Sequence, residues 1–353
     1  MIIKALTCRN FRNIEELEAG SFDEMNVICG ENAQGKTNML ESIWLFTGMK
    51  SFRGSRDSEL VKKDREKAVN GLEFVSAGTE ESARLEISER RTAFLNGKKL
   101  KAASELAEHF SAVVFSPGDL SLIKDGPAVR RRFLDTAIGQ LYPAYIGIIK
   151  KYTRAVIQRN SVIKDYRYDR TLEIMLDSFE DEIAAEAVKI VKFRARYISL
   201  LKEILPEIYG GISSGKESLE TFYMPSAADD VKERLKAART SDMLTGSTSS
   251  GPHRDDIGFK INGMSARSYG SQGQKRSVAL SLKIAEAEII KNISGEYPVF
   301  LLDDVMSELD PDRQSYILNR VKGIQTFITC CDPSNTASLE KGRIIYIENG
   351  RIR

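Results

Sequence analysis

The chain has 353 residues, 42% of them hydrophobic and 29% charged, with a formal net charge of +2. This composition is ordinary for a globular protein with room for two or three domains, and the balanced charge neither demands nor excludes a polyanionic partner. No apolar run approaches the roughly 18 residues that span a bilayer, and the N-terminus contains no secretory signal. Four cysteines without a CxxC pair and two histidines argue against a disulfide framework and a zinc site, so we expect a soluble cytoplasmic protein.

The first third of the chain predicts short strands and one helix. Strands are expected at 2–7, 14–17, 25–29 and 112–115, with more across 69–97, where Gly71, Gly78 and the Asn96-Gly97 turn interrupt them. Apolar residues at helical spacing predict a helix over 36–48.

From about residue 128 the pattern becomes helical. Two stretches, roughly 144–165 and 172–205, predict a helical hairpin or short arm that ends before Pro206. A loop-rich stretch follows, and then a strand at 257–261 and a helix after Gln272. Strands are expected again at 299–302, 326–330 and 343–348, with Cys330 and Cys331 as core residues at a strand end. Thus α/β segments at both ends of the chain enclose an α-rich middle.

Residues 30–37 match the phosphate-loop pattern G-x-x-x-x-G-K-[ST], between an apolar strand and an amphipathic helix. Glycines let backbone N–H groups close around phosphates, the lysine reaches the β and γ oxygens, and the threonine hydroxyl binds Mg²⁺. A chance match would lack the flanking strand and helix. The predicted nucleotide-binding residues are Gly30, Glu31, Asn32, Ala33, Gln34, Gly35, Lys36 and Thr37, and the predicted cofactors are ATP and Mg²⁺.

A second motif ends the apolar run at 299–302. Asp303 and Asp304 would lie at the carboxyl edge of a buried strand, where α/β proteins bind ligands. Asp303 is the predicted metal carboxylate opposite Thr37, and Asp304 is the predicted acid that polarises the attacking water. The alternative is a strand-to-helix turn in which an aspartate only caps the helix.

A third motif, G-S-Q-G-Q-K-R at 270–276, precedes an amphipathic helix. Ser271 and Gly273 at a helix N-terminus form an anion site, and they resemble the Ser-Gly-Gly-Gln signature of ABC-type ATPases, with Gln272 in place of the first glycine. In that family this loop closes over the γ-phosphate held by the opposite subunit. The alternative is a simple helix cap by Ser271.

Together the motifs predict an α/β fold of the ABC type, a P-loop ATPase head with a mixed sheet and flanking helices built from both termini. Residues 1–122 and 293–353 would form the ATPase lobe with the phosphate loop and the carboxylate strand. Residues 123–292 would form a mainly α-helical second lobe, with the arm at about 128–205 and the signature loop and helix.

Seven segments in chain order resemble the RecF family, bacterial recombinational repair ATPases related to SMC and Rad50 heads. They are Asn10-Phe11-Arg12-Asn13, GENAQGKTN at 30–38, KSFRGSRDSELVK at 50–62, VVFSPGDLSLIKDGPAVRRRFLD at 113–135, SGPHRDD at 250–256, YGSQGQKRSVALSL at 269–282 and LLDDVMSELD at 301–310. Gly118 departs from the acidic residue that family members often carry there.

This resemblance implies a slow, DNA-stimulated ATPase that works as a switch and forms a homodimer with ATP. It also implies binding to double-stranded DNA at gaps and junctions by structure and not by sequence, and action with RecR, RecO and RecA at stalled forks, near the nucleoid. Lys36, Ser271 and Asp304 would be the catalytic residues, with Ser271 acting across the dimer. The short Asp304 stands where related heads use glutamate. Arg12 matches a turn that approaches the nucleotide, although a plain surface arginine is the alternative.

Residues 123–164 carry nine Lys or Arg against two Asp, a net charge of 9 − 2 = +7. Such a basic stripe would neutralise backbone phosphates without reading bases. The alternative is a solvated helix face that acidic neighbours compensate. The predicted DNA-binding residues are Arg130, Arg131, Arg132, Lys150, Lys151 and Arg154.

Proteins of two other functional classes carry some of the same motifs. The ATPase subunit of an ABC-type membrane transporter has the same three motifs, but the helical insertion and Gln272 argue against it. A small-molecule P-loop kinase would have no signature helix.

Overall fold

The computed structural model describes residues 1–353 except 167, 228–229 and 332–341. The chain divides into two compact units, described separately below. The head unit comprises Met1–Leu120, Glu207–Lys216 and Arg276–Arg353, and the arm unit comprises Ser121–Pro206 and Glu217–Lys275. In the described part of the chain, no helix is long and apolar enough to cross a membrane.

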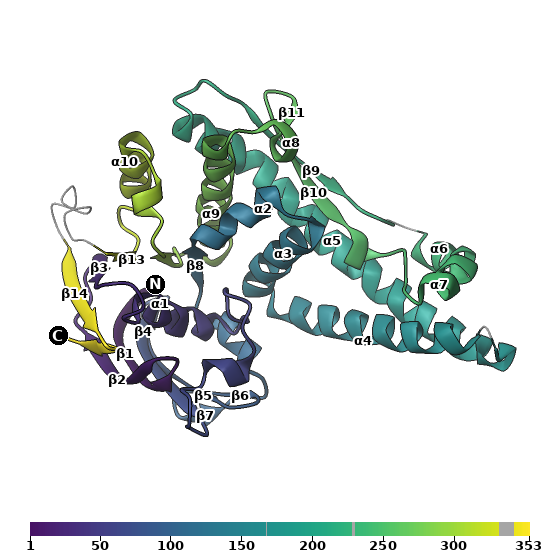
Figure 1. Ribbon diagram of the computed structural model, residues 1–353, viewed down its shortest axis with the longest axis horizontal. Coiled ribbons are helices and arrows are strands. Elements are labelled where there is room, and N and C mark those ends of the chain that lie inside the picture. The colour runs from purple at the N-terminus through teal and green to yellow at the C-terminus, as the bar shows by residue number, and fades with distance from the viewer. Residues whose placement is uncertain (167, 228–229, 332–341) are drawn as a thin grey trace. The chain divides into compact units, whose positions relative to one another are not determined.

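The head unit contains two six-stranded sheets, of which the first is antiparallel (Figure 1). Its order is β2-β1-β4-β5-β6-β7, with β1 (Ile2–Phe11), β2 (Ile14–Gly20), β4 (Ala68–Ser76), β5 (Thr79–Ile87), β6 (Arg91–Leu95) and β7 (Lys98–Lys99). Gly71 was expected to interrupt a strand, but β4 runs through it. A Cβ at Gly71 would lie 2.5 Å from the Thr7 hydroxyl, so the glycine lets β1 and β4 approach closely.

The second sheet of the head unit is parallel except for β15. Its order is β15-β14-β3-β13-β12-β8, with β3 (Met25–Cys29), β8 (Ala112–Phe115), β12 (Val299–Leu302), β13 (Thr326–Cys330), β14 (Arg343–Glu348) and β15 (Arg351–Ile352). Every residue of β3, β8, β12 and β13 is buried. This explains why their sequences are continuous apolar runs without alternation, as expected for strands covered on both faces.

The helices of the head unit connect these strands. They are α1 (Lys36–Trp44), α10 (Pro311–Arg320) and the 3₁₀ turns η1 (Leu45–Thr47), η2 (Asp57–Leu60), η3 (Ala103–Glu108), η4 (Pro117–Leu120) and η7 (Met306–Glu308). The predicted helix over 36–48 is therefore one α-helix followed by a 3₁₀ turn that ends at Gly48, whose φ of 75° suits glycine.

The arm unit is mainly helical and contains one three-stranded sheet, in the order β11-β10-β9. Its elements are α2 (Ser121–Lys124), α3 (Pro127–Leu141), α4 (Pro143–Tyr166), η5 (Arg170–Leu172), most of α5 (Glu173–Ile212), β9 (Leu219–Met224), α6 (Val231–Ala237), α7 (Arg239–Thr245), η6 (Pro252–Arg254), β10 (Asp256–Ile261), β11 (Met264–Ser265), α8 (Ala266–Tyr269) and the first residues of α9 (Gln272–Ser294), the rest of which belongs to the head unit. The hairpin of α4 and α5 confirms the predicted pair of long helices (Figure 1). The stretch expected to be rich in loops contains β9, α6 and α7.

Helix α5 does not end before Pro206, as the sequence predicted, but continues to Ile212. Proline removes one helical hydrogen bond, and the buried residues Leu205, Ile208 and Tyr209 compensate by packing on both sides of it. The compact units also differ from the predicted lobes. Residues 207–216 and 276–292 belong to the head unit, because α5 and α9 each contribute residues to both units, and residues 121–122 belong to the arm unit. Apart from this, the division into lobes stays a prediction.

Candidate nucleotide site

The phosphate loop follows β3, and Asp303 follows β12. Strand β13 lies between β3 and β12, and all three strands are parallel. Their carboxyl ends therefore meet at one edge of the sheet, where an α/β protein binds its ligand. The segments converge although about 270 residues separate them along the chain.

The backbone of the phosphate loop requires small residues. A Cβ at Gly30 would lie 2.3 Å from the backbone oxygen of Ile347, so no side chain fits there. Ala33 has a φ of 66°, and Gly35, the N-cap of α1, has a φ of 115°. Left-handed residues turn successive N–H groups to one side, and the N-terminus of α1 adds its positive dipole end. The loop can therefore hold an anion.

Lys36 lies inside this loop and is 7% exposed. Its ammonium donates to the backbone oxygens of Gly30, at 2.5 Å, and Glu31, at 3.0 Å. Both partners are neutral acceptors, so they leave the charge of Lys36 uncompensated. Phosphate oxygens would be stronger acceptors for the same donors.

Thr37 and Asp303 meet as the sequence predicted. The Thr37 hydroxyl donates to the Asp303 carboxylate at 2.8 Å, and the Thr329 hydroxyl donates to the same oxygen at 3.0 Å. Burial raises the pKa of Asp303 above its ordinary value, and the charge of Asp304 adds to this effect, against the opposing hydrogen bonds and the charge of Arg53. A nearby divalent cation would favour the ionised form.

Asp304 adopts a left-handed conformation with a φ of 52°. Its backbone N–H donates to the Thr329 hydroxyl at 2.8 Å, which fixes this conformation. For a residue other than glycine, a left-handed backbone conformation costs roughly 1–2 kcal/mol of free energy. Residues with backbone strain of this size are found mainly at functional sites. Asp304 is half-buried and directly follows Asp303 at the carboxyl end of β12.

The Arg12 side chain forms hydrogen bonds with protein groups of the head unit. Its guanidinium donates to both carboxylate oxygens of Glu41, at 2.9 and 3.0 Å, and to the Ser55 hydroxyl at 2.7 Å. Glu41 is fully buried in α1, so Arg12 fixes the helix that carries Lys36 and Thr37. A direct contact from Arg12 to nucleotide stays a prediction.

Several residues of this site were not identified from the sequence. Asn13 donates to the backbone oxygen of Ala33 at 3.0 Å and accepts from the Asn38 amide at 2.7 Å. The Asn349 N–H donates to the Gln34 side chain at 2.5 Å, and the Gly350 N–H donates to the Gln34 backbone oxygen at 2.9 Å. The phosphate loop is therefore held from outside by two turns that lie far from it in sequence.

Two more such residues act on Asp303. Arg53 donates to Asn38 at 2.8 Å and lies 3.7 Å from Glu41, and its charge acts on Asp303. Thr329 bonds both aspartates, as described above. No local signal marked Thr329, because the parallel pairing of β13 with β12 that brings it to Asp303 joins segments separated along the chain.

Ser271 and Gly273 belong to the arm unit. The Ser271 hydroxyl accepts from the Gln274 N–H at 3.1 Å, and the Gln274 side chain accepts from the Ser271 N–H at 2.7 Å. This reciprocal cap starts α9, as the alternative interpretation expects. Ser271 is also exposed, so the cap leaves it accessible to a second molecule.

The basic stripe of the arm unit divides into internal and external residues. Arg130 is buried, forms an ion pair with Asp256 at 2.6 Å and donates to the backbone oxygens of Leu122 and Asp125. Its prediction as a DNA-binding residue is wrong for this structure, because Asp256 already neutralises it. Arg159 of the stripe is likewise buried, between Glu180 and Asp242.

The other predicted DNA-binding residues are at least partly exposed to solvent. Arg131 is half-buried and donates to the Asp255 backbone oxygen at 2.7 Å, and burial lowers its pKa. Exposed side chains remain at Arg132, Lys150, Lys151 and Arg154. Three of these, Lys150, Lys151 and Arg154, lie on α4, and Arg132 lies on α3.

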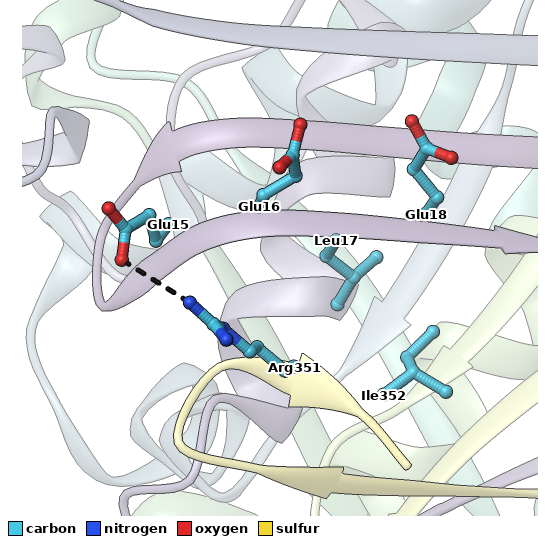
Figure 2. Close-up of a pocket in the computed structure, with 6 residues that line it drawn as sticks. All are labelled: Glu15, Glu16, Leu17, Glu18, Arg351 and Ile352. Carbon is cyan, nitrogen blue, oxygen red and sulfur yellow. Dashed lines mark ion pairs between the residues drawn. The ribbon is translucent and has the colours of Figure 1, made fainter.

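A separate hollow of about 430 Å³ lies between β2 and β15 of the head unit (Figure 2). Glu15, Glu16 and Glu18 line it, and Arg351 lies 3.7 Å from the Glu15 carboxylate. Its carboxylates would repel a triphosphate, so it does not compete with the phosphate loop as a nucleotide site.

Known proteins resemble the chain over its whole length. Residues 2–352 match the RecF/RecN/SMC N-terminal domain family. The DNA replication and repair protein RecF of Agathobacter rectalis is 40% identical over 336 residues, which cover 94% of this chain and 92% of that protein. RecF of Bacillus cereus strain AH820 is 38% identical, with 100% and 98% covered.

Solved structures agree with this result. A structure of the recombination mediator protein RecF with ATP, from the RecFOR pathway, superposes with a TM-score of 0.92 at 37% identity, and covers 100% of this chain and 97% of that one. The SMC head of Pyrococcus furiosus, with a TM-score of 0.56, 17% identity and coverage of 100% and 95%, shares the fold alone. The ABC-type ATPase head predicted from the sequence is thus confirmed.

Proposed function

The chain belongs to the RecF/RecN/SMC N-terminal domain family, and on this basis we propose that it is an ATP-dependent DNA-binding protein of replication and repair. The observation that carries the proposal is the convergence of Lys36, Thr37 and Asp303 at one sheet edge, in a chain similar over its full length to RecF proteins. ATP binds in this proposal with its phosphates in the loop of residues 30–37.

The oxygen atoms of Thr37 and Asp303 fit the ligand preference of a magnesium ion. A hydroxyl and a carboxylate oxygen 2.8 Å apart are hard oxygen ligands, and Mg²⁺ in nucleotide sites takes few protein ligands beside phosphates and water. When bound, the ion would reduce the charge repulsion among the phosphate oxygens. Thr329 keeps the Asp303 carboxylate oriented toward Thr37.

Hydrolysis in this proposal is slow and serves as a switch. Lys36 stabilises the charge that develops on the β and γ oxygens, and Asp304 orients the attacking water and accepts its proton. The aspartate is one methylene shorter than a glutamate, and its left-handed backbone sets the direction in which it reaches. Ser271 of a second copy contacts the γ-phosphate, so ATP joins two chains and hydrolysis releases them.

The DNA-binding surface is assigned to the exposed residues Arg132, Lys150, Lys151 and Arg154 of the arm unit. These side chains suit backbone phosphates of duplex DNA, which fits recognition by structure and not by sequence. RecR is the proposed direct partner, with RecO and RecA acting afterwards.

Sedimentation with and without nucleotide tests the switch. We expect dimers with ATP and Mg²⁺ and monomers with ADP. Ser271→Ala is expected to bind ATP with its affinity changed by less than about threefold, since the residue acts in the other chain. The same variant is expected to remain monomeric, because the γ-phosphate loses its contact across the dimer. Normal dimerisation of Ser271→Ala would show that the signature loop does not act across the dimer.

The alternative function, the ATPase subunit of a transporter, is not supported by these relatives. Full-length similarity to RecF proteins favours the repair function. Gapped duplex DNA should stimulate ATP hydrolysis, whereas detergent-solubilised lipid without DNA should not. The opposite response would favour the transporter subunit.

A further inference from the structure

Three of the four cysteines gather at the phosphate loop. Cys29 ends β3 directly before Gly30, and Cys330 pairs with it in register on β13. The sulfurs of Cys29 and Cys330 are 3.0 Å apart. Cys331 follows, so the cluster of Cys29, Cys330 and Cys331 adjoins the loop that holds Lys36. The proposed ATP chemistry uses none of these thiols.

The cluster contains two buried thiols and one exposed thiol. Cys29 is 1% and Cys330 5% exposed, and burial, with Cys29 adding to it, raises the pKa of Cys330 far above its ordinary value. The fourth cysteine, Cys8, is buried too, and burial raises its pKa to about 12. Since all four cysteines lie in the described part of the chain, Cys331 is the one exposed thiol. The thiolate is the reactive form, so the buried thiols are poor nucleophiles.

Cys331 touches the groups that define the phosphate loop. Its sulfur lies 3.6 Å from the Lys36 ammonium, and its S–H donates to the Asn32 side chain at 3.1 Å. The same ammonium contacts the backbone oxygens of Gly30 and Glu31. A group attached to this sulfur would occupy the space beside Lys36 that a phosphate needs.

We propose that Cys331 is a thiol-modification site that controls nucleotide binding, through a mixed disulfide with a low-molecular-weight disulfide. The added group excludes phosphate from Lys36, and reduction restores the site. This inference rests on the proposed ATP-binding function. It gives the protein a direct response to the thiol–disulfide balance of its surroundings.

The chemistry is a thiol–disulfide exchange. The Cys331 thiolate attacks one sulfur of the small disulfide, a new S–S bond forms, and the old S–S bond breaks. The released thiolate takes up the proton that Cys331 lost. The small disulfide is the only oxidant required, and excess thiol reverses the exchange by the same route.

ATP and the modification should exclude each other. A bound triphosphate draws Lys36 into phosphate contacts and fills the space beside the Cys331 sulfur, so it should slow the exchange. Because coupling between two ligands is reciprocal, the modified protein should bind ATP weakly for the same reason. Both effects can be measured on the full chain.

The test treats the reduced full-length protein with oxidised glutathione at about pH 8, since mildly alkaline solution favours thiol–disulfide exchange. We expect one glutathione adduct, on the peptide that contains Cys331, and a loss of affinity for a fluorescent ATP analogue of at least about 30-fold, as expected when a charge-assisted contact is lost. Dithiothreitol should restore binding. Saturating ATP with Mg²⁺ should slow adduct formation by at least about tenfold, since only nucleotide-free protein reacts.

Two kinds of variant serve as controls. Cys331→Ser and Cys331→Ala should each bind the analogue equally well before and after treatment. Cys8→Ser keeps Cys331 and should lose affinity on treatment, as the parent protein does.

Three results would overturn the proposal: unchanged affinity in protein modified at Cys331, no protection by ATP, or the loss of two hydrogens without an adduct, which would indicate a Cys29–Cys330 disulfide instead. A reduced protein that binds no analogue would refute the proposed ATP function itself, and this inference with it.

Discussion

The head unit and the arm unit each bury a basic side chain, but they surround it with different partners. Lys36 in the head unit donates to two backbone carbonyl oxygens. Arg159 in the arm unit is fully buried and bonds the carboxylates of Glu180, at 3.1 Å, and Asp242, at 2.7 Å. Both side chains are shielded from water, yet only one of them is electrically neutralised by the protein.

This difference separates a ligand-binding cation from a structural one. Carbonyl oxygens carry no net charge, so Lys36 can exchange them for phosphate oxygens and gain energy. Carboxylates already neutralise Arg159, and releasing it would leave buried negative charges without compensation. Whether a buried cation is available to an anion therefore depends on the charge of its present partners more than on its exposure. Arg130, paired with Asp256, falls into the structural class.

The largest expected effect is the destabilisation caused by Arg159→Leu. The change leaves Asp242 without its counter-ion, whereas Glu180 keeps Arg239 at 2.6 Å. Loss of one partner from a buried ion pair costs about 3–5 kcal/mol, so urea unfolding should show a decrease of that size. Arg154→Leu, an exposed position on the same helix, should change stability by less than about 0.5 kcal/mol.

The double variant Arg159→Leu with Asp242→Leu sharpens this prediction. It removes both charges and should recover part of the lost stability. If the double variant is less stable than Arg159→Leu alone, the uncompensated carboxylate is not the cause.

Lys36→Met should show the opposite pattern. We expect ATP affinity to fall by at least about 100-fold, because the charge-assisted contacts to two phosphates are lost. Stability should change by less than about 1 kcal/mol, since no carboxylate loses its counter-ion. Calorimetric titration with ATP and urea unfolding of the same preparation measure both quantities. Destabilisation as large as that of Arg159→Leu would remove the distinction between the two cations.

The exposed part of the basic stripe gives the third prediction. Replacement of Lys150, Lys151 and Arg154 by glutamate should weaken duplex binding by on the order of 10- to 100-fold and flatten the salt dependence by about one unit per lost phosphate contact. Titration of gapped duplex at several salt concentrations measures both effects. The same triple replacement at Lys98, Lys99 and Lys101, a basic cluster of the head unit, is the matched control. An unchanged salt slope in the α4 variant would place the DNA surface elsewhere.

Features encoded locally were predictable from the sequence. The phosphate loop, its flanking strand and helix, and the buried strands were found because their residues act through adjacent backbone. Helices α6 and α7, with seven residues each, are too short to show a helical period, and they were taken for loop. The end of α5 was placed at Pro206, since the sequence gives no measure of the packing that carries a helix through a proline.

Features that depend on distant segments were not predictable. The nine basic residues at 123–164 were counted as one stripe, but the fold pairs Arg130 with Asp256 and Arg159 with Asp242. Likewise Thr329 joins the site through the pairing of β13 with β3 and β12, and Asn13 joins it through side-chain hydrogen bonds from the turn between β1 and β2. Composition gives the number of charges, and only the fold decides which of them face solvent.

Asn13 provides the smallest and most specific prediction. Asn13→Asp keeps the oxygen that accepts from Asn38 but replaces the amide that donates to the Ala33 carbonyl. The left-handed turn at Ala33 then loses its tether, and we expect ATP affinity to fall by about five- to tenfold, the value of one hydrogen bond. Asn13→Leu, which is neutral, should give a loss of the same order and so exclude the added charge as the cause. Asn96→Asp, the same change at an asparagine in a turn between β6 and β7, should leave affinity unaltered. If Asn13→Leu binds ATP like the parent protein, the phosphate loop holds its shape without this turn, and its own glycines suffice.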